Sequence, residues 1–184
     1  LIKSLVGDLK LIQGLRKDSE LLNIGYFAQH QMDALDGNAS PMLQLARIAD
    51  KKISEASLRS FLGSFGFSGE RMDTPSESFS GGERARLALA LIVWQRPNVL
   101  ILDEPTNHLD LDMRHALTMA LQDFQGAVVL VSHERQLIAS VCDELLLVHN
   151  GQCREFDGDL AAYADWLRQA RSEMIKNGKS RPNR

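Results

Sequence analysis

The sequence has little of several features that would point to particular protein classes. Its two cysteines, Cys142 and Cys153, stand in no CxxC or Cys/His pattern, which argues against a cysteine metal site and favours reduced, incidental thiols. No apolar run reaches the roughly 20 residues that cross a bilayer. The formal net charge is −3, so the chain as a whole lacks the basic character of a nucleic-acid-binding domain.

A phosphate-binding loop of the form GxxxxGK[ST] is also absent from the 184 residues. The chain opens at Leu1 on a pattern that predicts an amphipathic helix, which Gly7 would end. Residues 9–17 are expected to form a short pair of strands around Gly14, and residues 21–27 an apolar strand. With 44% hydrophobic residues, the composition is that of a globular domain with a sizeable core.

The centre of the chain, residues 79–110, holds two patterns that rarely occur together by chance. In the first, Ser80-Gly81-Gly82 opens a strongly apolar helix expected over residues 82–95. The first backbone N–H groups of a helix are unpaired and carry partial positive charge, and glycines let the backbone approach an anion closely. This start of the helix is therefore suited to phosphate.

The second pattern is a continuous apolar run, residues 99–102, that ends in Asp103 and Glu104. An apolar run without polar alternation is typical of a parallel strand that is covered on both faces. Carboxylates at the carboxyl end of such a strand lie where α/β proteins bind their ligands.

Together these patterns resemble the ATP-binding cassette (ABC) ATPases, with the signature motif beginning at Ser80 and the Walker B strand ending at Asp103. The resemblance, which covers about residues 1–166, implies an α/β fold: a P-loop NTPase core with a mostly parallel sheet and an inserted α-helical subdomain. It assigns residues 1–30 and 79–170 to the core, 31–78 to the helical subdomain and 171–184 to a basic, disordered tail. In the family the Walker A phosphate loop directly precedes a helix like the first one here, so we expect the amino-terminal part of the core to be missing.

The resemblance also implies roles for the residues at the strand ends. Asp103 would help to hold Mg²⁺ partly through water, and Glu104 would orient or deprotonate the attacking water. His133, which follows the apolar run 127–131, matches the switch histidine that contacts the γ-phosphate. Gln29 matches the Q-loop glutamine, which touches the Mg²⁺ ion and the water; His108, His115 and His149 have no such context and stay unassigned.

Further matched residues act across a dimer of cassettes in the family. The signature residues Ser80, Gly81, Gly82 and Glu83 grip the γ-phosphate of ATP that the opposite cassette holds. Asp110, in the D-loop, shapes the partner site and is also expected to cap the next helix. The implied cofactors are ATP and Mg²⁺, and the implied partner is a second cassette of the same chain.

Finer features resemble the ABC-F branch: the run Glu-Pro-Thr-Asn-His-Leu-Asp at 104–110 and Phe-Asp-Gly-Asp-Leu-Ala-Ala-Tyr at 156–163. Proteins of that branch are cytoplasmic ATPases with two cassettes and no membrane domain, and many act on the ribosome near the exit tRNA site. The resemblance therefore implies a ribosome-associated translation factor with ribosome or tRNA as partner. The chain alone is expected to be inactive because the Walker A loop is absent.

Two other functions stay in view. The nucleotide-binding subunit of an ABC membrane transporter would need a membrane partner, and its D-loop more often reads Ser-Ala-Leu-Asp. A chromosome-maintenance or repair ATPase would carry a long coiled coil between Gln29 and Ser80, where no heptad repeat of that length is present. The basic residues at 176–184 leave a non-specific nucleic-acid contact open.

The remaining elements follow from caps, turns and apolar periodicity. Asn150-Gly151 is a strong two-residue hairpin signal, which predicts that residues 152–156 pair with the strand before it. The expected helices are 42–49, 54–65, 111–124, 135–141 and one that begins near residue 160, and the further expected strands are a buried 127–131 and 144–149.

Overall fold

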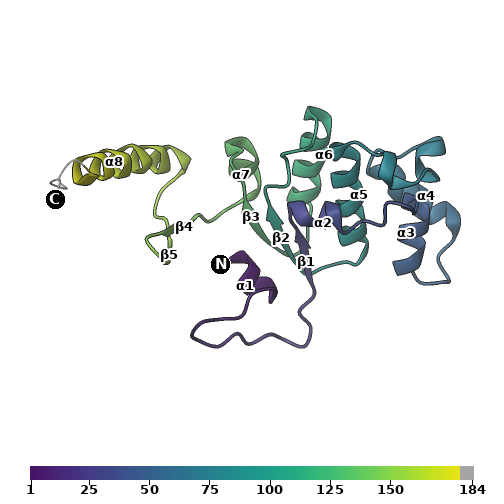
Figure 1. Cartoon of the computed structure of the whole chain (residues 1–184), viewed down its shortest axis with the longest axis horizontal. Helices are drawn as coiled ribbons and strands as arrows, with labels where there is room; N and C mark the ends of the chain where they lie inside the picture. The colour runs from purple at the N-terminus through teal and green to yellow at the C-terminus, as the bar shows by residue number, and fades with distance from the viewer. Residues whose placement is uncertain (179–184) are drawn as a thin grey trace, which may run out of the picture. The chain divides into compact units, whose positions relative to one another are not determined.

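The computed structural model describes residues 1–178, with the side chains of Gln29 and of residues 173–178 outside the described part. The chain divides into two compact units, of which the first is Leu1–Glu134 and the second begins at Arg135. Figure 1 labels the helices and strands of both units along the chain. The expected tail, 171–184, begins within the last helix, and its residues 179–184 lie outside the described residues.

The first unit contains a parallel sheet with the strand order β1-β2-β3. The strands are β1 (Ile24–Phe27), β2 (Val99–Asp103) and β3 (Ala127–Val131). In the register, Phe27 lies beside Leu102, and Leu102 lies beside Leu130. The carboxyl ends of all three strands therefore meet at one edge, as Figure 1 shows. This sheet confirms the predicted parallel α/β core.

Strand β2 is the central strand, and its apolar residues 100–102 are buried, as the sequence predicts. Strand β3 was expected to be buried as well, and this prediction was wrong. Ala127 and Val131 are exposed and the three residues between them are half-buried. The reason is the position of β3 at the edge, since within the described residues it pairs with β2 on one side only.

Between β1 and β2 the chain is helical. It forms α2 (Gln29–Asp33), α3 (Pro41–Ile48), α4 (Glu55–Ser64), the short 3-10 helices η1 (Gly69–Met72) and η2 (Ser76–Ser78), and α5 (Gly81–Trp94). Serine side chains cap α3 and α4: Ser40 accepts from the N–H of Leu43 and Ser54 from that of Ser57. One apolar cluster joins α3, α4 and η1 to α5, and its buried members are Leu45, Leu58, Leu62, Phe67, Met72, Phe79, Leu87 and Ala90.

The chain before β1 differs from the prediction. Helix α1 (Ile2–Val6) forms and ends at Gly7, but residues 9–17 contain no strand. Ile12 is 101% exposed and Leu15 89% exposed, so these residues bury no apolar face. A strand pair without such a face is only marginally stable in water.

After β2, helix α6 (Leu111–Gln122) leads to β3 within the first unit. The second unit contains α7 (Arg135–Val141), the antiparallel hairpin β4 (Leu146–His149) and β5 (Gln152–Glu155), and α8 (Leu160–Gly178). Asn150 and Gly151 both have positive φ, 48° and 75°, as the predicted hairpin turn requires. Across residues 1–178, no helix is long and apolar enough to pass through a bilayer.

Candidate functional site

The register of the sheet brings the predicted strand-end residues to one edge. Gln29 begins α2 directly after β1, Glu104 directly follows β2, and His133 stands two residues after β3. These positions are far apart in sequence and become neighbours because the three strands are parallel. The structure describes the backbone of Gln29 but not its side chain.

The side chains of Glu104 and His133 are in contact. Glu104 Oε1 lies 3.2 Å from His133 Nε2, and Glu104 Oε2 accepts from the backbone N–H of His133 at 3.4 Å. The backbone N–H of Glu104 donates to the carbonyl of Val131 at 2.8 Å, which anchors the residue to the end of β3. Glu104 has φ 50°, a left-handed conformation that is uncommon for a residue with a side chain and recurs at functional sites.

A cavity of about 240 Å³ opens beside these strand ends, lined by Met32, Asp103, Glu104, Asn107 and His108. Within residues 1–178, no group of three or more His, Cys, Asp or Glu side chains is placed to hold a metal by itself. Mg²⁺ typically takes one or two carboxylates and fills its other positions with water and phosphate oxygens. Asp103 fits such an ion, provided that a nucleotide and water supply the remaining ligands.

The signature residues form the start of α5. The hydroxyl of Ser80 accepts from the N–H of Glu83 at 3.3 Å, and the Glu83 carboxylate accepts from the N–H of Ser80 at 2.9 Å, so the two residues form a capping box. Arg71 holds the same carboxylate with two bonds, Nε to Oε1 at 2.8 Å and Nη2 to Oε2 at 3.1 Å. Partial burial alone would raise the pKa of Glu83, but the hydrogen bonds from Ser80 and Arg71 outweigh it and lower that pKa.

Gly82 allows the loop after β2 to lie against this helix start. A Cβ atom at Gly82 would lie 2.7 Å from the carbonyl oxygen of His108, closer than real Cβ contacts allow. A Cβ at Gly81 would be 3.6 Å from Nδ1 of His108, an ordinary contact. His108 therefore joins the start of α5 to the cavity that Asp103 and Glu104 line.

Asp110 caps α6, as the sequence predicts, and accepts from the N–H of Met113 at 2.9 Å. It does not line the cavity. Met32, Asn107 and His108 line the cavity, although none of them was predicted as a site residue. Asn107 and His108 could have been found from their place between Glu104 and Asp110, whereas nothing in the local sequence marks Met32.

A second cavity, of about 290 Å³, contains none of the predicted site residues. It lies beside β1, and its wall includes Asp8, Asn23, Tyr26, Gln31 and Gln95. Burial, and after it the charges of Asp103 and Asp8, raise the pKa of Tyr26. The phenol of Tyr26 is therefore neutral at physiological pH and offers no charge to a ligand.

Solved structures support the fold. The archaeal ribosome recycling factor aABCE1, in its complex with the ribosomal stalk protein aP1, matches with a TM-score of 0.64 and 22% identity, over 84% of this chain and 30% of that chain. The dimeric ATP-binding cassette MJ0796 bound to ADP and Pi matches with a TM-score of 0.58 and 18% identity, over 74% of this chain and 64% of that chain. At these identities the likeness shows the fold alone, and it confirms the predicted ABC ATPase fold.

Sequence relatives give the family. Residues 5–107 match the family described as ABC transporter. The chain is 54% identical to the probable ATP-binding protein YheS of Escherichia coli K12 and 41% identical to ATP-binding cassette sub-family F member 3 of Homo sapiens. These matches cover 91% and 92% of the chain but 26% and 24% of the relatives, so the chain spans about a quarter of their length. The chain belongs to the ATP-binding cassette family, on the ABC-F branch.

Proposed function

We propose that this chain contributes catalytic and signature residues to an ATP-hydrolysing protein of the ABC-F type. The observation that carries the proposal is the placement of Glu104. Its backbone is anchored to the end of β3, its carboxylate touches His133, and with Asp103 it lines a cavity. An oriented carboxylate at the end of a buried parallel strand is what the positioning of an attacking water requires.

The residues at the carboxyl edge of the sheet then have separate roles. Glu104 orients the attacking water and accepts its proton, and His133, whose side chain is 96% exposed, is free to reach the γ-phosphate. Asp103, together with Gln29, holds Mg²⁺ partly through water. When bound, the ion supplies positive charge to the phosphate oxygens.

The start of α5 serves the nucleotide of a second cassette. Gly81 and Gly82 present backbone N–H groups at the helix start that Ser80 caps, where an anion is favoured. Glu83 belongs to the same element, and Asp110 shapes the neighbouring loop of the partner site. Because the 184 residues contain no GxxxxGK[ST] sequence, ATP must be held by a phosphate loop from outside them.

The parent function we favour is a ribosome-associated, cytoplasmic translation factor. The stronger support is that the chain belongs to the ABC-F branch. Residues 104–110 have the sequence of that branch, and the relatives that are 41–54% identical are of the ABC-F type. A weaker support is the fold likeness to aABCE1, a ribosome recycling factor. The alternative is the nucleotide-binding subunit of an ABC transporter. It is supported by the description of the matched family, which is ABC transporter.

The test uses E. coli YheS in which the 167 matched residues are replaced by the corresponding residues of this chain. We name this hybrid protein the YheS chimera. Glu104→Gln in the chimera should trap bound ATP, because the amide cannot accept the proton of the water. We expect this variant to sediment with ribosomes in ATP and not without nucleotide. Glu70→Gln, an exposed carboxylate outside the site, is the matched control and should behave like the parent.

If the Glu104→Gln variant binds ATP and still stays in the supernatant, the ribosome assignment is wrong. Copurification with a membrane protein would then favour the transporter subunit. If the Glu104→Gln variant does not accumulate bound ATP, the catalytic role proposed for Glu104 is wrong.

A further inference from the structure

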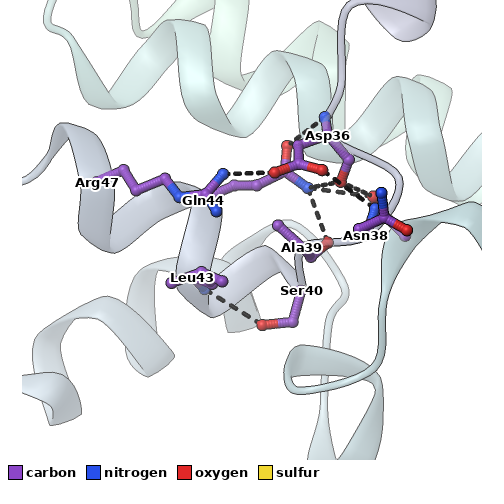
Figure 2. Close-up of polar contacts among 8 residues, drawn as sticks. Asp36, Asn38, Ala39, Ser40, Leu43, Gln44 and Arg47 are labelled. Carbon is purple, nitrogen blue, oxygen red and sulfur yellow. Dashed lines mark hydrogen bonds and ion pairs between the residues drawn. The ribbon is translucent and has the colours of Figure 1, made fainter.

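A buried glutamine in α3, Gln44, bonds both to residues just before its own helix and to Ser76, which lies 32 residues further along the chain. The Gln44 side chain is 7% exposed. Its amide nitrogen donates to the carbonyls of Asp36 and Ala39 at 3.1 and 3.0 Å and to the hydroxyl of Ser76 at 3.1 Å. Its amide oxygen accepts from the N–H of Asp36 at 3.3 Å, and Figure 2 shows this amide among its partners.

The same two segments are also joined directly. The N–H of Ser76 donates to the carbonyl of Ala39 at 3.1 Å, and the N–H of Glu77 donates to that of Gly37 at 2.8 Å. The hydroxyl of Ser76 donates to the carbonyl of Asp36 at 3.0 Å. We name this junction of residues 36–39 with 76–77, held by Gln44, the clamp.

The clamp lies between the two elements that reach the candidate site. Asp36 follows the end of α2 by three residues, and Met32 of α2 forms part of the cavity wall beside Asp103 and Glu104. Glu77 precedes Ser80, the first residue of the signature, by three residues. A shift of α2 that follows filling of the cavity therefore reaches Ser80 through the clamp.

We propose that Gln44 is a positioning residue that makes α2 and the signature start of α5 move as one body. The inference rests on the proposed function, because it concerns how a nucleotide at the cavity sets the position of Ser80. Two of the three acceptors that face the Gln44 nitrogen are backbone carbonyls, which only accept hydrogen bonds, so the amide orientation is fixed. Gln44 adds side-chain bonds to both segments of the clamp, beside the bonds that join the segments directly.

Methionine at position 44 keeps the length and volume of the side chain but removes its hydrogen bonds. The carbonyls of Asp36 and Ala39 then each lose a partner, and the clamp is held by its backbone bonds and Ser76 alone. The matched control is Ser40→Ala, which removes the cap of the same helix, the 3.2 Å bond from Leu43, and leaves the clamp intact. Both variants weaken α3, and only one loosens the clamp.

The first measurement is hydrogen exchange of the full chain, which needs no enzymatic activity. We expect Gln44→Met to speed exchange of the Ser76 and Glu77 amides by at least about tenfold, because the variant loses all the hydrogen bonds of the Gln44 amide and one such bond can be worth about that factor. Ser40→Ala should speed exchange only at the start of α3. Equal protection of residues 76–77 in Gln44→Met and the parent, or an equal loss in both variants, overturns the clamp.

The second measurement is steady-state ATP hydrolysis by the YheS chimera. Gln44→Met should lower kcat about tenfold, with KM for ATP changed less than about twofold, because the residue acts on signature position and not on nucleotide affinity. Ser76→Ala should have a smaller effect, and the double variant should lower kcat by less than the product of the two single effects, since both side chains act through one junction. A raised KM with unchanged kcat overturns the positioning role. A parent chimera without ATPase activity contradicts the proposed function, while hydrogen exchange still decides on the clamp.

Discussion

At the scale of single residues, the charge at the start of α5 affects whether a phosphate can bind there. Glu83 carries a carboxylate at the helix end where the proposed γ-phosphate would lie, and like charges there repel. Arg71 holds both oxygens of that carboxylate and also lies over the ring of Phe79, 4.8 Å from its centroid. Arg71 therefore offsets the charge of Glu83 and fixes its place in the capping box.

Replacing Arg71 by methionine tests this role. Arg71→Met should reduce ATP hydrolysis by the YheS chimera roughly five- to tenfold, the effect of one lost charge-assisted contact. Glu83→Gln in the same chain should restore most of the activity, because the amide keeps the cap without a charge. The control, Arg59→Met, removes an exposed pair with Asp73 and should change little. Failure of Glu83→Gln to rescue would show that Arg71 acts by packing and not by charge.

The pH dependence of stability follows from the same carboxylate. Its folded-state pKa is lowered, so ionised Glu83 stabilises the folded chain at pH values above the ordinary carboxyl pKa, about 4.3. That contribution is lost as the pH falls through the lowered folded-state value. Between pH 6 and pH 3, the urea midpoint of the parent should therefore fall more steeply than that of Glu83→Gln. Parallel curves for the two proteins would contradict the lowered pKa.

Single residues also show what the sequence can and cannot predict. Glu104 and His133 were each assigned to the site through the family resemblance, and the parallel strands that precede them bring the two residues together. The bond between Gln44 and Ser76 was not predictable, since a buried glutamine has no local pattern and its partner lies 32 residues away. Such a contact depends on how two loops pack, which short-range spacing does not encode.

At the scale of elements, the contact of α5 with the loop after β2 gives a paired test on neighbouring glycines. Gly82→Ala should destabilise the chain by roughly 1–3 kcal/mol, because the new Cβ overlaps the carbonyl of His108 and the loop must move. Gly81→Ala meets only an ordinary contact and should be neutral or stabilise by up to about 1 kcal/mol, as alanine favours a helix. Urea unfolding of the full chain measures both. Equal midpoints for the two variants would rule out the close contact.

Element bounds were predictable where the signal is local. The caps at Ser40, Ser54, Ser80 and Asp110 place the starts of four helices, because a capping side chain bonds to an N–H within three residues. The expected strand pair at 9–17 failed because strands need a neighbour to pack on, and Ile12 and Leu15 have none. The predicted burial of β3 was wrong for a related reason, since an apolar sequence does not reveal which strand lies at the edge of the sheet.

At the scale of the whole molecule, the candidate site is built from separate stretches of sequence that the fold assembles. The strand ends supply the carboxylates and His133, the start of α5 supplies the signature, and His108 connects them. A phosphate loop is not among the 184 residues. The chain therefore contains the proposed catalytic groups without the loop that would hold the phosphates.

From this composition we expect that the purified chain neither binds nor hydrolyses ATP appreciably, whereas the YheS chimera does both. The measurement is magnesium-dependent release of phosphate from ATP at equal molar amounts of the two proteins, with Glu104→Gln of each as the control for contaminating ATPases. Turnover by the chain alone that Glu104→Gln abolishes would mean that its own backbone N–H groups replace the phosphate loop. Turnover that survives Glu104→Gln would come from a contaminant. An inactive chain beside an active chimera means that hydrolysis needs groups outside the 184 residues, the phosphate loop and the second cassette among them.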